Sequence, residues 1–286
     1  LAVAGAYSDY FSIGVGCGNL LSYGVFDLGT EEKAALGRDQ LFTAGHTSAS
    51  DLTNKAFDGS KITEDVAHSW YDNSSGLHPS QGETEPNPNK STGYSWVKSP
   101  RYNDEVYEVG PLARMVTNYV AGDPTTQTLV NSVLSHFGAG PSALFSVLGR
   151  HAARALECKI VGDKCAEWAL QLKPGEPVAV DAEVPDSAMG EGFWEAPRGA
   201  LGHWVNIKDQ KIKNYQCVVP TTWNASPMDA KGQPGPIEQA INGTIIQDEE
   251  NPFEIVRIVR SFDPCLACAV HIVRPGSRSV GKFRVL

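Results

Sequence analysis

The 286-residue sequence lacks the two features that mark membrane-spanning and nucleic-acid-binding chains. No uninterrupted apolar run approaches the roughly 18 residues of a membrane helix, and the stretch 143–147 soon meets Gly149, Arg150 and His151. Basic residues are not in excess either, because the formal net charge is −9 at pH 7. Nucleic-acid binding relies on clustered Lys and Arg. We therefore expect no nucleic-acid partner.

The first residues give no indication of a leader sequence. The segment 1–6 is short and apolar, but no basic stretch precedes it, so a signal peptide is not supported. The first residue is Leu1 and not Met, which favours a sequence that begins inside a longer chain.

Cysteine is sparse, and an even count in a chain of this length does not imply a disulfide framework. Four cysteines are scattered among apolar neighbours and are predicted to be buried thiols: Cys17, Cys158, Cys165 and Cys217. Only Cys265 and Cys268 form a motif.

Hydrophobic residues make up 41% of the chain, enough for a sizeable core. Glycines and apolar residues in 12–26 predict turns and short strands. Residues 72–104 are rich in Asn, Ser, Gly, Pro and Glu, which predicts a long polar loop that adds no core element. Apolar residues in 203–219 flank the polar pair Asp209–Gln210, a pattern typical of a β-hairpin.

Helical periodicity dominates the middle of the chain. Pro111 lies near the predicted start of a helix that reaches residue 120. The segment 141–172 carries the strongest helical pattern, which Gly162 is expected to divide into two helices. On its apolar stripe, His151 is predicted to be a hydrogen-bonded core histidine, and we expect Arg154 and Glu157 to form structural pairs within the helix bundle.

The sequence Asp263-Pro-Cys-Leu-Ala-Cys-Ala-Val-His271 carries the chemistry. Two thiolates three positions apart can bind one metal, and soft thiolates suit nickel, iron, zinc and copper(I). Covalent haem attachment needs His directly after the second Cys, a zinc ribbon needs a second Cys pair, and a thioredoxin-type pair needs a βαβ context. Taken alone, the motif is equally compatible with two thiols packed in a core.

The same motif resembles the C-terminal signature of nickel–iron hydrogenase large subunits of the uptake, membrane-bound type. Further blocks resemble that family in the same order, at residues 108–114, 148–154, 195–204, 214–225 and 260–263. The resemblance implies the helix-bundle core of the large-subunit fold, mainly α with small β-hairpins (α+β). Residues 1–271 would be the C-terminal part of that domain, and 272–286 an extension removed on maturation.

The resemblance also implies roles for single residues at a nickel–iron centre whose iron carries carbon monoxide and cyanide. Cys265 would be a terminal nickel ligand and Cys268 a bridge between nickel and iron. Arg198 would lie beside one cyanide and above the open metal position, and Thr221 would serve the other cyanide. The pocket for these ligands would be formed by Pro197, Arg198, Val219, Pro220 and Thr221.

One carboxylate and one imidazole complete the expected site. Asp263 would orient the Arg198 guanidinium through paired hydrogen bonds, although the two could also form a purely structural ion pair. His271, with the backbone carbonyl of Cys217, would ligate a second-sphere magnesium or an iron in its place. An endopeptidase would cut between His271 and Ile272.

The resemblance further implies what the chain does not carry. The other two thiolates and a catalytic glutamate would come from a missing N-terminal part of the large subunit, and the iron–sulfur clusters from a small subunit. A membrane cytochrome b is a further candidate partner. We expect a periplasmic, membrane-associated enzyme that oxidises H₂ reversibly, matured in the cytoplasm. The alternatives are a metal-free fragment, a relative of the quinone-site subunit of complex I, and a zinc-binding module.

Overall fold

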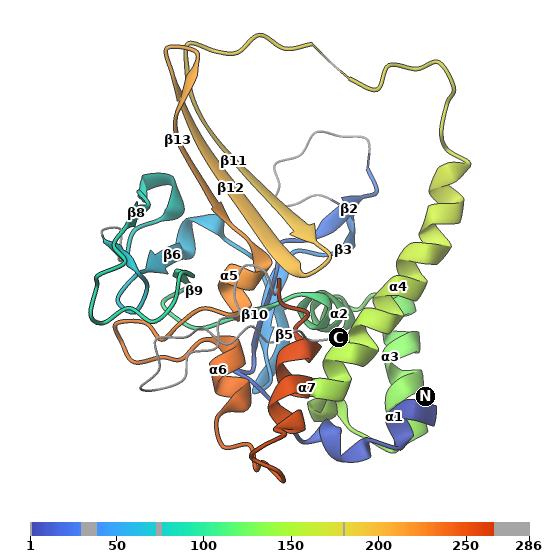
Figure 1. Cartoon of the computed structure of the whole chain (residues 1–286). Helices are drawn as coiled ribbons and strands as arrows, with labels where there is room; N and C mark the ends of the chain where they lie inside the picture. The colour runs from blue at the N-terminus through green and yellow to red at the C-terminus, as the bar shows by residue number, and fades with distance from the viewer. Residues whose placement is uncertain (1, 30–38, 73–75, 180, 266–286) are drawn as a thin grey trace.

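The computed structural model describes residues 2–29, 39–72, 76–179 and 181–265 (Figure 1). Cys268, His271, Ile272 and the expected extension 272–286 therefore lie outside the described residues. Within the described ranges, every helix is too short or too polar to cross a bilayer.

A four-stranded sheet forms the centre of the body, in the order β10-β1-β4-β5. It comprises β1 (Asn19–Ser22), β4 (Gly45–Ser48), β5 (Asp51–Lys55) and β10 (Glu108–Val109). β10 is parallel to β1 and leads through Gly110 into α2 (Pro111–Ala121), which packs on the sheet. Pro111 occupies the first turn of α2, where its missing N–H costs nothing. The predicted helix at this position is confirmed.

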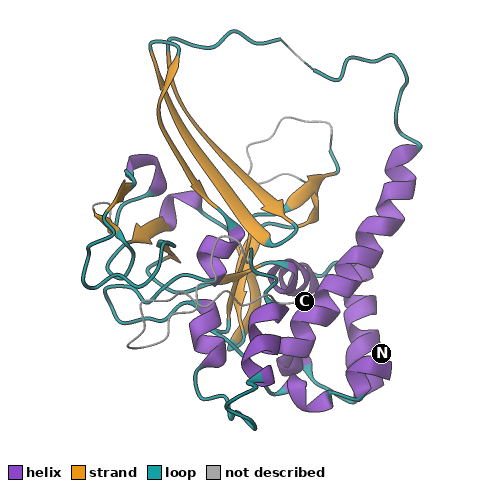
Figure 2. Cartoon of the chain, in the orientation of Figure 1, coloured by secondary structure: helices purple, strands orange, loops and turns teal. Residues whose placement is uncertain are grey.

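Two longer helices pack against α2 and complete the helical side of the body (Figure 2). α3 (Pro124–Phe137) begins at Asp123, whose carboxylate accepts the Thr126 N–H, and α4 (Val147–Ala169) begins at Ser146, whose hydroxyl accepts the Gly149 N–H. Buried apolar side chains from all three helices form one core: Leu112, Met115, Val116, Val130, Leu134, Ala153 and Ile160.

The expected break at Gly162 is wrong, because α4 continues through it as a single helix. A lone glycine lowers helix stability by only about 1 kcal/mol relative to alanine, and tertiary packing of Ala153 and Ile160 offsets this. His151 is exposed and not a core residue, so that prediction is also wrong. A short 3-10 turn, η4 (Pro141–Leu144), precedes the helix.

Several shorter helices complete the body. α1 (Ala2–Gly5) and η1 (Ser8–Phe11) lie at the N-terminus, and α5 (Pro220–Asn224), α6 (Pro236–Ile241) and α7 (Phe253–Ser261) follow late in the chain. α7 packs on α4 and α6. Its last residues lead into the segment that carries Asp263 and Cys265.

A long three-stranded antiparallel sheet, which we call the arm, projects from the body (Figure 1). It consists of β11 (Ser187–Ala196), β12 (Gly199–Lys208) and β13 (Lys211–Val218). The predicted hairpin is β12 and β13, joined by Asp209 and Gln210 in left-handed conformations, with φ of 53° and 56°. β11 was not predicted, because its sequence shows no apolar alternation and its outer part is exposed on both faces.

Residues 57–107 form a lobe of short elements, so the segment 72–104 is not the single polar loop that its composition predicts. It holds η2 (Gly59–Lys61), β6 (Ile62–Asp65), β7 (Tyr71–Asp72), η3 (Pro79–Gln81), β8 (Glu85–Pro86) and β9 (Ser99–Tyr102). Every residue of β9 is buried, so this segment does contribute to the core. The expected short strands near the N-terminus are β1 and β2 (Val25–Asp27), and β2 pairs with β3 (Gln40–Phe42).

The fold is therefore more mixed than the predicted mainly α class, because small sheets carry as much of the architecture as the helices do. The prediction that the four scattered cysteines are buried, which was made from their apolar neighbours in sequence, is also wrong. Cys17 is partly buried, and the residues Cys158, Cys165 and Cys217 are exposed.

Candidate metal-binding site

The arm turns back toward the body at a tight connection that carries Arg198. β11 ends at Ala196 and β12 begins at Gly199, so Pro197 and Arg198 form the turn between paired strands. Gly199 has φ of 134°, and a side chain there would place its Cβ 2.7 Å from the Gly110 backbone nitrogen. Only glycine fits this close approach of two backbones. The turn therefore sits directly against the start of α2.

Asp263 meets Arg198 from the other side, just after α7. The Arg198 Nε donates to the Asp263 backbone oxygen at 2.8 Å and lies 3.3 Å from its Oδ2. The Arg198 Nη2 donates to Oδ1 at 3.5 Å. Asp263 itself has a positive φ of 52°, which points its carbonyl and carboxylate to the same guanidinium. With 46% and 43% of the two side chains exposed, the pair contributes little to stability.

A hydrogen bond to Thr221 fixes the position of Cys265, two residues after Asp263. Val219 and Pro220 precede Thr221 at the start of α5, and the buried Thr221 Oγ1 accepts the Cys265 backbone N–H at 3.2 Å. Cys265 is partly buried. Two segments that are 44 residues apart in sequence are thereby fastened beside each other.

The structure thus gathers most of the predicted site residues that it describes. Arg198 contacts Asp263, Thr221 contacts Cys265, and Asp263 and Cys265 are two residues apart. Pro197 and Val219 are exposed next to Arg198 and Pro220. Cys217 is the second-last residue of β13 and pairs with His203, and no hydrogen bond or ion pair joins it to the others within the described part of the chain.

The donors present suit a metal with anionic ligands. Within residues 2–265 as described, the Arg198 Nη1 has no hydrogen-bond acceptor, and the Thr221 hydroxyl accepts from Cys265 without donating to a protein atom. Two donors are therefore left beside one thiol. The same described residues contain no group of three or more His, Cys, Asp or Glu that could hold a metal. The segment fits as one part of a thiolate metal site whose other ligands lie elsewhere.

A buried charge network lies directly behind the turn. Arg114 of α2 binds both Glu195 of β11 and Glu157 of α4. Burial raises the pKa of Glu195 to about 7, although the Arg114 charge and the Tyr23 N–H act in the opposite direction. The side chains of this network line a cavity of about 290 Å³ that also reaches Pro197 and Asp263, and the residues of the network that line it are Arg114, Arg154, Glu157 and Glu195.

The sequence indicates these pairs incompletely. Glu157 pairs with Arg114 of another helix, and Arg154 donates to the Ser261 backbone oxygen at 3.0 Å, so the expected bundle pairs are confirmed for Glu157 alone. The available signal was an arginine within the apolar face of a predicted helix, since a buried arginine requires a partner.

Comparison with known proteins places these features in context. Residues 1–271 match the family model described as nickel-dependent hydrogenase. The periplasmic [NiFeSe] hydrogenase large subunit of Desulfomicrobium baculatum is 42% identical over 273 residues, covering 93% of this chain and 52% of that protein. The uptake hydrogenase large subunit of Bradyrhizobium diazoefficiens is 43% identical, covering 79% of this chain and 43% of the other.

A solved structure shows the same likeness in three dimensions. The H₂-activated [NiFeSe]-hydrogenase of Dm. baculatum superposes with a TM-score of 0.82 at 42% identity, over 94% of this chain and 55% of that one. The chain therefore spans about half the length of the relatives that it matches.

Proposed function

Since the chain belongs to the nickel-dependent hydrogenase family, we propose that it is the C-terminal part of a hydrogenase large subunit. The intact enzyme would oxidise H₂ reversibly to two protons and two electrons. The observation that carries this proposal is the gathering of Arg198, Thr221, Asp263 and Cys265 within a match that runs over residues 1–271.

Cys265 and Cys268 would hold the metals, Cys265 as a terminal nickel ligand and Cys268 as a bridge from nickel to iron. Thiolate sulfur suits both metals. The remaining thiolates would come from the N-terminal part of the large subunit. When bound, the nickel–iron centre, with carbon monoxide and cyanide on iron, supplies the position at which H₂ is split heterolytically.

Arg198 would contact Asp263 on one side and a cyanide ligand on the other. Asp263 engages Nε and Nη2, which fixes the plane of the guanidinium and leaves Nη1 to donate to one cyanide. The same cation would lie above the open metal position and polarise the reacting molecule. Thr221, with the backbone at Pro220, would donate to the other cyanide, and Pro197 and Val219 would complete the pocket.

The remaining assignments concern the ends and partners of the chain. His271 and the carbonyl of Cys217 would ligate magnesium, and a maturation endopeptidase would cut between His271 and Ile272. Partners would be an iron–sulfur small subunit and a membrane cytochrome b. The name of the Dm. baculatum relative supports a periplasmic location.

Metal analysis of the matured full-length enzyme separates this proposal from its alternatives. We expect nickel and iron together. Absence of metal would favour a relative of the complex I quinone-site subunit, although the presence of both Cys265 and Cys268 argues against that reading. Zinc alone would indicate a zinc-binding module.

Replacing Cys265 by Ser should abolish nickel retention in the full-length enzyme, because a hydroxyl is a poor substitute for a soft thiolate ligand. The matched control is Cys217→Ser, which alters an exposed side chain and leaves the backbone carbonyl in place. Nickel content should be normal in the control. Normal nickel in Cys265→Ser would refute the ligand assignment.

Replacing Arg198 by Lys should leave the metals bound but lower H₂ turnover by about 10-fold or more, because the planar fork that Asp263 holds is lost. Turnover and nickel content are measured on the same preparation. Unchanged turnover would reduce Arg198 to a structural role.

A further inference from the structure

We propose that Arg114 is the positioning residue for Arg198, acting through the backbone of the turn that carries it. The inference rests on the proposed function. It concerns a residue that would touch neither metal nor substrate, since its side chain is 1% exposed and lies behind the turn.

All five N–H groups of the Arg114 guanidinium are used. Nε and Nη2 donate to the two carboxylate oxygens of Glu157, each at 2.9 Å. Nη1 donates to the Glu195 carboxylate and, at 3.0 Å, to the Ala196 carbonyl. Nη2 also donates to the Pro197 carbonyl at 2.9 Å. One side chain therefore binds three consecutive residues that end just before Arg198.

The anchor itself is held rigidly. Arg114 lies one turn into α2, and its backbone N–H donates to the Gly110 oxygen at 3.0 Å. A Cβ on Gly110 would lie 2.9 Å from the Arg198 carbonyl oxygen, so the start of α2 is already in contact with the Arg198 backbone. Glu157 ties the other edge of the guanidinium to α4. Two packed helices thus define where the turn sits.

Arg198 needs such an anchor because its own side chain has little else to fix it. The side chain is nearly half exposed, and its hydrogen bonds within the described residues all go to Asp263. A displacement of about 1 Å at a reacting group can cost about 100-fold in rate. A shift of the Pro197 carbonyl would move the Arg198 backbone with it.

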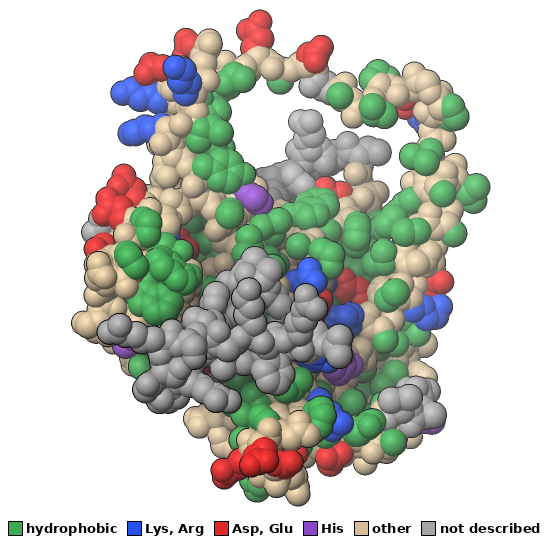
Figure 3. Space-filling view, in the orientation of Figure 1, with side chains coloured by type: hydrophobic (Ala, Val, Ile, Leu, Met, Phe, Trp, Pro, Cys, Tyr) green, Lys and Arg blue, Asp and Glu red, His purple; other side chains and the backbone are tan. Residues whose placement is uncertain are grey.

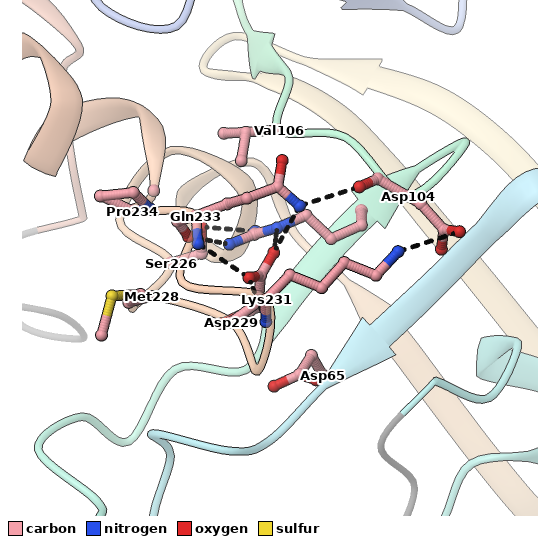
Figure 4. Close-up of polar contacts among 12 residues, drawn as sticks. Asp65, Asp104, Val106, Ser226, Met228, Asp229, Lys231, Gln233 and Pro234 are labelled. Atoms are coloured by element: carbon pink, nitrogen blue, oxygen red, sulfur yellow. Dashed lines mark hydrogen bonds and ion pairs between the residues drawn. The ribbon is translucent and has the colours of Figure 1, made fainter.

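A charge-retaining variant, Arg114→Lys, tests this role in the intact, matured enzyme. Lysine keeps the positive charge between Glu157 and Glu195 but cannot make five hydrogen bonds in a plane. The matched control is Arg101→Lys, which changes another buried arginine. Arg101 binds the Asp229 carboxylate at 2.6 Å and the backbone oxygens of Pro227 and Gln233, and none of its hydrogen bonds within the described residues goes to the Pro197–Arg198 turn. Figure 4 shows Asp229 and Gln233 of this cluster.

Four readouts separate positioning from general destabilisation. We expect nickel and iron content to be retained in both variants. In Arg114→Lys alone, kcat should fall about 10- to 100-fold with little change in KM, as for a small displacement of a reacting group. Amide hydrogen exchange should accelerate in a peptide covering residues 196–204, and the infrared bands of the cyanide ligands should shift or broaden.

The outcomes are distinguishable from those of the proposed function. If Arg198→Lys lowers turnover while Arg114→Lys behaves like Arg101→Lys in kcat and exchange, the positioning role is overturned and the proposed function stands. If Arg198→Lys has no effect, the proposed role of Arg198 itself fails.

A second variant covers the case in which Arg114→Lys does not mature. Glu157→Gln keeps Arg114 and its bonds to the Ala196 and Pro197 carbonyls but weakens its attachment to α4. We expect a smaller acceleration of exchange over residues 196–204 and a smaller loss of kcat. Exchange and kcat at the level of the unmodified enzyme would overturn the proposal.

Discussion

The body and the arm are stabilised in different ways. In the body, apolar side chains from three helices form a core, and ion pairs such as Arg150–Glu108 are fully buried. Strand pairing holds the outer part of the arm, where residues are exposed, for example Met189 at 68%, whereas nearer the body β12 and β13 also contact η3. Figure 3 shows hydrophobic side chains on the surfaces between the arm and the helical side of the body.

Only the base of the arm shares the core of the body. Phe193, Ala200, Trp204 and Val218 pack with buried residues of the central sheet, whereas the same strands further out have no such neighbours. Regular backbone pairing is therefore sufficient to form the strands, but tertiary packing fixes where the Pro197–Arg198 turn lies. The candidate site lies at the base of the arm, where strand pairing and core packing both act.

The largest effect should come from breaking a buried pair in the body. Arg150→Met leaves Glu108 buried without its cation and removes the bond to the Gly14 carbonyl. We expect a loss of about 3–5 kcal/mol in the free energy of unfolding, measured by urea titration. The control on the same helix is Lys159→Met, which removes an exposed pair with Asp163 and should cost less than about 1 kcal/mol. Equal losses of unfolding free energy in the two variants would show that the buried pair matters no more than the exposed one.

An intermediate effect is expected at the base of the arm. A Cβ at Gly202 would lie 2.4 Å from the buried Trp204 ring, so Gly202→Ala should cost about 1–3 kcal/mol through overpacking. Gly192 lies on the neighbouring strand with no atom within 4 Å of such a Cβ. Gly192→Ala should be neutral or slightly stabilising by the same urea measurement. A neutral Gly202→Ala would show that the base is loosely packed.

The smallest effect is expected at the outer arm. Met189→Ser should change the free energy of unfolding by no more than about 0.5 kcal/mol, because the side chain is exposed. The matched buried residue is Met115 of α2, for which Met115→Ala should cost about 2–5 kcal/mol. A loss above about 1 kcal/mol for Met189→Ser would mean that the outer arm packs as the base does.

Sequence patterns predicted the elements that depend on neighbouring residues. The α2 start at Pro111 and the β12–β13 hairpin at Asp209–Gln210 follow from backbone preferences that act within a few positions. The sequence patterns gave wrong predictions where tertiary packing overrides these local preferences. Gly162 does not interrupt α4, and β9 is buried although its surroundings in sequence are polar.

The candidate site shows the same division. The Cys265–Cys268 spacing and the Arg198 block are visible in the sequence, whereas the residues behind them are not recognisable as a network. Arg114 lies 82 residues from Ala196 along the chain, and no local pattern links an arginine on one helix to a carbonyl at the end of a strand.

The sequence by itself determined which chemical groups the proposed metal site can use, because thiolate, guanidinium and hydroxyl groups are properties of residue types and their spacing in short motifs. Only the tertiary structure decided that the Arg198 side chain faces Asp263 and that Arg114 binds the Pro197 carbonyl in the turn that carries Arg198. These contacts join segments brought together by packing of α2, α4 and the arm, and such long-range burial is not encoded in any single stretch of residues.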